Sequence, residues 1–275
     1  MELRTSGGTL GYDRTGDPAG PLVVLSPGFG DLRSTYAGLA AALAAAGCDV
    51  VTADLRGHGG SSVGWPGYSV DAVAGDLLAL LHAHGGRGVL VGNSYSGSAA
   101  VRAAAREPGA VAGLVLSGAF VRDQAGSPVQ RVLVRLFSRT VPGRWLWTTA
   151  AWPSLFRSRP ADFAARRAEL RTNLARPGGY EALRRMTTPE GNHAGTEPLL
   201  GAVRAPALVV MGTRDPDFPD PAAEARFTAD ALGGDAQVLL VDGAGHYPHT
   251  EAVDAVAPAV ADFVRAVSAA DRGGA

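Results

Sequence analysis

The sequence contains no lysine and only one cysteine. All 25 of its basic residues are arginines, they face 26 acidic residues, and the formal net charge is -1. No strand or helix candidate gathers these arginines into a phosphate-binding surface, so we expect no nucleic-acid partner. Cys48 has no second cysteine to pair with, which excludes a small disulfide-stabilised secreted fold. We interpret Cys48, in AAGCDVV, as a small buried residue rather than a nucleophile.

Long apolar runs are also missing, and the N-terminal residues do not support export through a signal peptide. The N-terminal stretch MELRTSGGTLGYDRTGD lacks the basic start and the apolar run of a signal peptide. The longest apolar stretches, such as LAAALAAAG, are too short to span a bilayer. We therefore expect a cytoplasmic protein without a membrane partner. With 46% hydrophobic and 19% charged residues, the 275-residue chain has room for one large core and an insertion.

Short Val/Leu runs alternate with Ala-rich stretches of helical period. This alternation is typical of βα units that build a mostly parallel sheet flanked by helices. An antiparallel hairpin at the sheet edge is predicted for 2–14, around Gly7-Gly8. Strands are predicted at 22–26, 49–54, 88–93, 112–118, 207–212 and 237–243. Helices are predicted at 34–46, 70–84, 95–106, 222–232 and 253–269.

The alternation stops between the strands at 112–118 and 207–212, a gap far longer than a usual βα connection. We predict a helical cap at 124–200, inserted into a core formed by 1–123 and 201–275. The cap is rich in aromatic residues, most of which we expect to pack in its interior while some line an apolar pocket. Three arginines lie just before the predicted cap or within it: Arg122, Arg131 and Arg135. They either meet a substrate carboxylate or face solvent.

A candidate nucleophile follows the strand predicted at 88–93. The segment Gly92-Asn93-Ser94-Tyr95-Ser96 leads directly into the helix predicted at 95–106. A sharp turn from strand to helix strains its central residue and lifts the Ser94 hydroxyl above the sheet, while small residues on either side let strand and helix approach. The pattern is G-x-S-x-S where G-x-S-x-G is usual. We predict Ser94 as the nucleophile of a hydrolase.

A serine nucleophile needs a base and a group that orients the base, and in such folds the acid precedes the base in the chain. Asp215 follows the strand at 207–212, and His246 follows the strand at 237–243, so both lie at the sheet edge of Ser94. Asp217 and His249 are the alternatives for these two roles. We favour Asp215 and His246 because they stand directly after their strands.

The reaction also needs donors for a developing oxyanion. The Gly-rich loop Ser26-Pro27-Gly28-Phe29-Gly30 follows the strand at 22–26, and we predict the backbone N–H groups of Phe29 and Tyr95 as the donors. The loop lacks the pattern of a phosphate loop. His58 has no second ligand at metal-binding spacing, so we expect it in a structural loop and expect no metal and no cofactor.

Taken in order, the segments S-P-G-F-G, D-L-R-G-H-G, G-N-S-Y-S-G, G-T-R-D and G-A-G-H resemble the α/β-hydrolase superfamily over nearly the whole chain. The resemblance implies an eight-stranded sheet with one antiparallel strand, a lid after the sixth strand and the triad Ser94, Asp215 and His246. Within the superfamily, the sequence is similar to the branch of capped esterases, carbon-carbon hydrolases and cofactor-free haloperoxidases. Two positions depart from the pattern: Ser26-Pro27 replaces a common His, and Ser96 replaces a Gly.

These features together predict a serine hydrolase. The substrate is expected to be a small to medium, mostly apolar carboxylic ester or lactone, cleaved through an acyl-enzyme at Ser94. Ser at the elbow, where dehalogenases and epoxide hydrolases carry Asp, disfavours those activities. A carbon-carbon-bond hydrolase or other biosynthetic enzyme, and a ligand sensor with a retained triad, remain as alternatives. The sequence leaves the oligomeric state open.

Overall fold

The computed structural model describes residues 1–122, 143–188, 193 and 195–273 of the chain. An eight-stranded sheet forms its centre, in the order β1-β2-β4-β3-β5-β6-β7-β8. Only β2 runs against the other strands, since it pairs antiparallel with both β1 and β4. The strands are β1 (Glu2–Arg4), β2 (Thr9–Gly16), β3 (Leu22–Ser26), β4 (Asp49–Ala53), β5 (Gly88–Asn93), β6 (Val111–Ser117), β7 (Ala207–Gly212) and β8 (Ala236–Val241).

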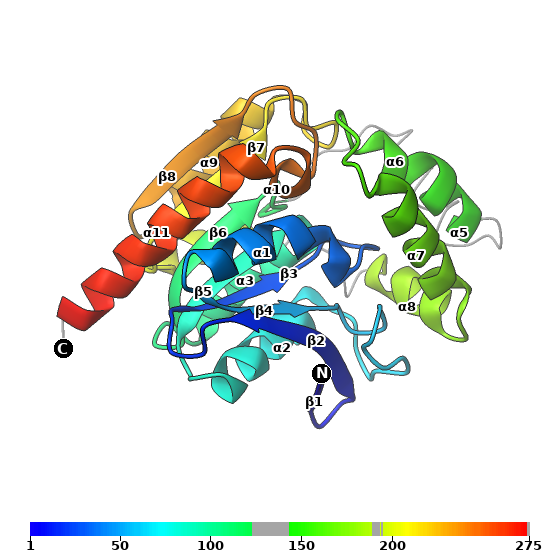
Figure 1. Ribbon diagram of the computed structural model, residues 1–275, viewed down its shortest axis with the longest axis horizontal. Helices are drawn as coiled ribbons and strands as arrows, with labels where there is room; N and C mark the ends of the chain where they lie inside the picture. Colours follow the sequence, from blue (N-terminus) through cyan, green and yellow to red (C-terminus); the bar gives the residue numbers. More distant parts are fainter. Residues whose placement is uncertain (123–142, 189–192, 194, 274–275) are drawn as a thin grey trace.

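Helices cover both faces of this sheet (Figure 1). One face packs against α1 and α11, and the other against α2, α3 and α9. The helices of the core are η1 (Arg33–Tyr36), α1 (Ala37–Ala45), α2 (Val70–Ala83), α3 (Tyr95–Arg106), η4 (Glu197–Ala202), α9 (Pro221–Ala231), α10 (Pro248–Glu251) and α11 (Val253–Gly273). The mostly parallel, eight-stranded sheet flanked by helices, predicted from the alternating apolar runs, is confirmed.

The central strands β3, β4, β5 and β6 are buried along their whole length, which explains their unbroken Val/Leu runs. The predicted bounds of β3, β5 and β7 agree with the structure. β6 ends one residue earlier than predicted, because Gly118 takes a positive φ of 52° that an extended strand does not allow. The helix predicted at 34–46 begins as a 3₁₀ turn, η1, before α1.

After β6 the chain leaves the sheet and forms helices that lie beyond the carboxyl ends of the strands (Figure 1, green). They are α5 (Gly143–Leu146), η2 (Trp147–Ala151), α6 (Trp152–Ser154), α7 (Phe163–Ala175) and α8 (Gly179–Met186). We refer to α5 to α8 as the cap helices. The first part of the predicted cap, with Phe137, Arg131 and Arg135, lies outside the described residues. The bounds 124–200 stay a prediction.

An aromatic cluster joins the cap helices to the core. Trp152, Phe156 and Phe163 pack together and against Tyr247 of the core, with ring centroids 4.6 to 6.5 Å apart. All four side chains are buried. These aromatics therefore hold the cap on the sheet edge, as expected for most aromatics of the cap, whereas Trp145 is exposed. Within the part of the chain that the structure describes, no helix has both the length and the apolar character needed to cross a membrane.

Candidate active site

The turn between β5 and α3 strains Ser94. Its φ of 53° and ψ of -115° make it the only non-glycine residue with positive φ among those described. Such a backbone costs on the order of 1–3 kcal/mol and persists only where the surroundings enforce it. Gly92 permits the turn, since a Cβ there would lie 2.5 Å from the carbonyl oxygen of Ser96. The sequence prediction of a sharp strand-to-helix turn agrees with this geometry.

The two departures from the family pattern contact each other. Ser96 is fully buried and its hydroxyl donates to the carbonyl oxygen of Pro27. Because that bond uses the proton of Ser96, the 2.9 Å contact between the Ser26 and Ser96 hydroxyls has Ser26 as the donor. The serine pair thus ties the Gly-rich loop after β3 to the turn that carries Ser94.

The same loop lies directly against Ser94. A Cβ on Gly28 would be 2.9 Å from Cβ of Ser94, so only glycine allows this approach. Tyr95 is the first residue of α3, and its N–H therefore has no acceptor within the helix. Trp147 of the cap donates from Nε1 to the carbonyl oxygen of Gly30, at 2.9 Å, and packs edge-on against Phe29. A cap residue thus helps to hold the loop that contains the predicted donor Phe29.

His246 and Asp215 meet below the pocket. Nδ1 of His246 lies 2.8 Å from Oδ2 of Asp215, and both side chains are buried. The alternative acid, Asp217, lies 3.6 Å from the same Nδ1, and its N–H donates to Oδ1 of Asp215 at 3.0 Å. The alternative base, His249, is buried and stacks on Tyr36. The structure therefore brings together the acid and base that the sequence favoured, with Asp217 as a second carboxylate beside them.

These carboxylates set the protonation of the imidazole. Burial lowers the pKa of His246, but the charges of Asp215, Asp217 and Glu251 outweigh burial and raise it to about 9. Burial and the neighbouring charge of Asp215 raise the pKa of Asp217, while the charge of His246 opposes them. The imidazole is held mostly as the cation at neutral pH.

Clusters of carboxylates and a histidine also bind metal ions in proteins. Among the described residues, Asp215, Asp217 and His246 offer ligand atoms within 4.8 Å of one another. Two ligand atoms on one tetrahedral zinc ion are roughly 3.4 Å apart, given bonds near 2.1 Å. The 2.8 Å separation of Nδ1 and Oδ2 instead has the length of a charge-assisted hydrogen bond. The arrangement suits an imidazole oriented by a carboxylate better than a metal centre.

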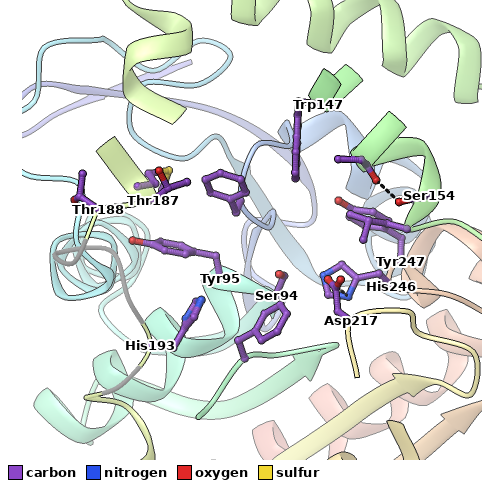
Figure 2. A pocket seen from close by; sticks show the side chains of 15 residues that line it. Ser94, Tyr95, Trp147, Ser154, Thr187, Thr188, His193, Asp217, His246 and Tyr247 are labelled. Carbon is purple, nitrogen blue, oxygen red and sulfur yellow. Dashed lines mark hydrogen bonds and ion pairs between the residues drawn. The ribbon is translucent and has the colours of Figure 1, made fainter. Parts of the chain in front are cut away.

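A pocket of about 430 Å³ opens over Ser94 and His246 (Figure 2). Its lining is mostly apolar and includes Phe29, Phe120 and Trp147. No hydrogen bond joins Ser94 to His246 among the described residues, although both line the pocket; such bonds are commonly long in unliganded enzymes. A cavity of this size and character accommodates a small organic molecule beside the serine hydroxyl.

His193, which no sequence pattern indicated as a site residue, lies in the pocket wall beside Tyr95 (Figure 2). Its ring stacks on Phe120, with centroids 5.3 Å apart, and its Nδ1 lies 2.9 Å from the hydroxyl of Ser98. Burial and the charge of Arg102 lower the pKa of His193 to about 4, so the ring is neutral at pH 7. No pattern near position 193 signals this role, since its partners come from α3 and from the segment after β6.

Other residues singled out from the sequence are structural. His58 is fully buried, with Nδ1 3.1 Å from the carbonyl oxygen of Arg56, and it does not line the pocket. Cys48 is buried and free. Arg122 pairs with Glu224 of α9 rather than facing the pocket. The buried carboxyl of Asp31, beneath the cap, has its pKa raised by burial to about 6.

The sheet order, the strained serine after β5 and the histidine after β8 define an α/β-hydrolase. The chain belongs to the family described as serine aminopeptidase, S33, whose model matches residues 17–252. It is therefore a member of the α/β-hydrolase superfamily.

Solved structures of this fold resemble the chain over nearly its whole length. A thermophilic esterase from Thermogutta terrifontis superposes with a TM-score of 0.82 at 24% identity and covers 97% of this chain and 99% of its own. An enol-lactonase from Burkholderia xenovorans LB400 has a TM-score of 0.80 at 28% identity, with coverage of 96% and 100%. The esterase likeness supports the fold alone, and the lactonase is the more similar in sequence.

A curated relative is much longer. The polyketide synthase ThaQ of Burkholderia thailandensis is 32% identical over 273 residues, which cover 93% of this chain and 12% of that protein. The chain spans less than a third of the length of the curated relatives that it matches.

Proposed function

We propose that the protein is a serine hydrolase that cleaves small to medium, mostly apolar carboxylic esters or lactones through an acyl-enzyme at Ser94. The observation that carries this proposal is the pocket that has Ser94 and His246 in its wall, with the hydrogen bond from His246 to Asp215 beneath it. The serine, histidine and aspartate act as nucleophile, base and orienting acid.

In the proposed reaction, neutral His246 takes the proton of Ser94 as the serine oxygen attacks the substrate carbonyl. Asp215 accepts from Nδ1–H, which leaves Nε2 as the basic nitrogen, and it stabilises the imidazolium. The N–H groups of Phe29 and Tyr95 stabilise the oxyanion, and each such donor is worth roughly 2.7 to 4 kcal/mol. The imidazolium then protonates the leaving alkoxide, and a water molecule activated by His246 releases the acid. We propose no metal and no cofactor for these steps.

The apolar lining of the pocket supports an uncharged organic substrate. The similarity to the Burkholderia xenovorans enol-lactonase supports an ester or a lactone in particular. The family description names a serine aminopeptidase, which supports a serine as the nucleophile. The predicted cap at 124–200 supplies Trp147, Ser154 and Leu155 to the pocket and so contributes to substrate selection.

A fluorophosphonate probe tests the nucleophile directly. We expect labelling at Ser94 by peptide mapping, and turnover of p-nitrophenyl acetate and butyrate that falls by several orders of magnitude in Ser94→Ala. Ser34→Ala is the matched control, because the Ser34 hydroxyl donates to Glu169 and does not line the pocket. Labelling at another residue, or equal turnover in Ser94→Ala, contradicts the proposal.

A second candidate is hydrolysis of an acyl thioester, which the similarity to a polyketide synthase favours. Ser94 would attack the thioester carbonyl, the thiolate would leave and take a proton from His246, and water would release the acid. The assay compares the hexanoyl thioester of N-acetylcysteamine with ethyl hexanoate. A thioester preference far above the difference in the uncatalysed hydrolysis rates favours this candidate.

The carbon-carbon-bond hydrolase and ligand-sensor alternatives retain the same three residues. Cleavage of dienols or β-diketones from a test panel, together with little ester turnover, would favour the carbon-carbon-bond hydrolase. Very slow turnover of every ester, with ligand-dependent movement of the cap helices, would favour the second.

A further inference from the structure

One wall of the pocket carries polar groups that donate their protons in hydrogen bonds to other groups of the protein. Tyr95, Thr187, Thr188 and His193 form this wall, which we call the acceptor wall (Figure 2). The hydroxyl of Tyr95 donates to the carbonyl oxygen of Tyr68, at 2.8 Å. The hydroxyls of Thr187 and Thr188 donate to the backbone carbonyl oxygens three residues earlier, each at 2.7 Å. A hydroxyl has one proton and two lone pairs, so these three oxygens keep only acceptor capacity.

The tautomer of His193 follows from its contact with Ser98. The Ser98 hydroxyl donates to the backbone oxygen of Phe120, which has no proton to give. Its contact with Nδ1 of His193, at 2.9 Å, must therefore have Nδ1–H as the donor. A neutral imidazole with its proton on Nδ1 carries a lone pair on Nε2, and among the residues that the structure describes Nε2 has no hydrogen-bond partner.

The ring of His193 is held in this orientation from both sides. It stacks on Phe120 with an interplanar angle of 21°, and the ring of Tyr95 meets it edge-on at a centroid distance of 5.4 Å. Phe120 also lies next to His246, with centroids 5.9 Å apart. The ring that carries the Nε2 lone pair is thus fixed on Phe120, whose ring also lies against His246. The low pKa of His193 agrees with this arrangement, because a protonated ring could not act as an acceptor.

We infer that the acceptor wall selects substrates that carry a neutral hydrogen-bond donor, a hydroxyl or an amide N–H, on the part of the ester or lactone bound beside Ser94. This inference rests on the proposed function and narrows its substrate class. A purely apolar substrate leaves these lone pairs without partners in a pocket from which it displaces water, and such unmet groups reduce affinity. Arg102, whose charge acts on His193, disfavours an ammonium group as the donor.

The test separates this inference from the proposed chemistry by measuring binding without turnover. Ser94→Ala protein is titrated calorimetrically with methyl 6-acetamidohexanoate and with methyl 8-oxononanoate, which differ only in an N–H replaced by CH₂. The shorter pair, methyl 4-acetamidobutanoate and methyl 6-oxoheptanoate, varies the distance from the ester to the donor. We expect the amide of at least one pair to bind about 2- to 12-fold more tightly, the range of one net neutral hydrogen bond.

Two further variants assign the preference to the wall. His193→Phe and Thr187→Val, each in the Ser94→Ala background, are expected to bring the affinity ratio of the amide to its isostere towards one. Thr172→Val is the control, since Thr172 also donates to a carbonyl oxygen one turn earlier but does not line the pocket. Its ratio is expected to stay unchanged.

Equal affinity for both members of each pair, or a preference that survives both wall variants, overturns the inference. The p-nitrophenyl esters of the same acids are assayed in parallel with the wild-type chain. Absence of turnover there counts against the proposed ester hydrolysis, while the affinity ratio still decides the inference about the acceptor wall.

Discussion

The charge of Asp217 is expected to keep the proposed base, His246, protonated. Neutralising Asp217 is therefore expected to raise the rate of ester hydrolysis at neutral pH. The carboxylate lies 3.6 Å from Nδ1 of His246 and favours the imidazolium. The proposed mechanism needs neutral imidazole, and with a pKa of about 9 roughly 1% of the molecules hold it at pH 7. Asp217→Asn preserves the shape of the side chain and removes the charge, so the pKa of His246 falls.

The distance sets the size of the shift. Two unit charges 3.6 Å apart interact by about 1.2 kcal/mol at the dielectric constant of water, and by about 4.6 kcal/mol at an effective value of 20. The side chain of Asp217 is 30% exposed, so we place the effect towards the weaker limit. A pKa unit corresponds to 1.36 kcal/mol, which gives a fall of about 1 to 2 units. At pH 7 the value of kcat/KM then rises about 10-fold or more.

The assay is the pH profile of kcat/KM from pH 5 to 10, whose acidic limb reports the pKa of the base in the free enzyme. The limb is expected near pH 9 in the wild type and about 1 to 2 units lower in Asp217→Asn, with a similar plateau at high pH. Asp215→Asn is the contrasting variant: loss of the orienting acceptor is expected to reduce kcat about 10⁴-fold. An acidic limb that stays in place or moves upward in Asp217→Asn refutes the argument.

Two more predictions concern Gly28 and Asp31. Gly28→Ala introduces a Cβ 2.9 Å from Cβ of Ser94 and 2.8 Å from Oδ1 of Asn93. The displaced oxyanion loop is expected to lower kcat about 10- to 100-fold, measured by ester turnover. Gly109→Ala, where a Cβ meets nothing within 4 Å, is the control, and equal kcat values in the two variants would contradict this prediction. Burial raises the pKa of Asp31 in the folded state to about 6. Between about pH 4 and pH 6 the folded state therefore keeps a proton that the unfolded state has lost. The free energy of unfolding is expected to fall by about 3 kcal/mol as the pH rises through this range. Urea unfolding of the wild type and Asp31→Asn across this range tests it, and the same pH dependence in both would be the contrary result.

The sequence was most informative where one local rule decides the structure. β5 and α3 have the predicted bounds because a buried Val/Leu strand must end before the sharp turn at Ser94. Asp215 and His246 were found by the same reasoning, since each comes directly after a strand whose carboxyl end faces the site. Their catalytic roles, like the cytoplasmic location and the absence of a cofactor, stay predictions.

The features that the sequence did not predict depend on residues far apart in the chain. His193 reaches the pocket through Ser98, 95 positions away, and no local pattern records such a contact. From the sequence, Asp217 was only the alternative to Asp215, yet it lines the pocket beside His246, because the turn after β7 directs both carboxylates to one imidazole. The short cap helices, interrupted by prolines, have too little periodicity to fix their bounds.

The buried serine pair has a consequence for how this sequence tolerates change. Replacing Ser96 by the glycine that is usual at this position removes the donor to Pro27 and the acceptor of Ser26 in one step. A buried polar group without a partner costs on the order of 1–3 kcal/mol, so the substitution that looks like a return to the common pattern is destabilising unless position 26 changes too. The two sites are epistatic, and an evolutionary or engineered path between the two motifs must pass through a weakened intermediate or alter both residues together.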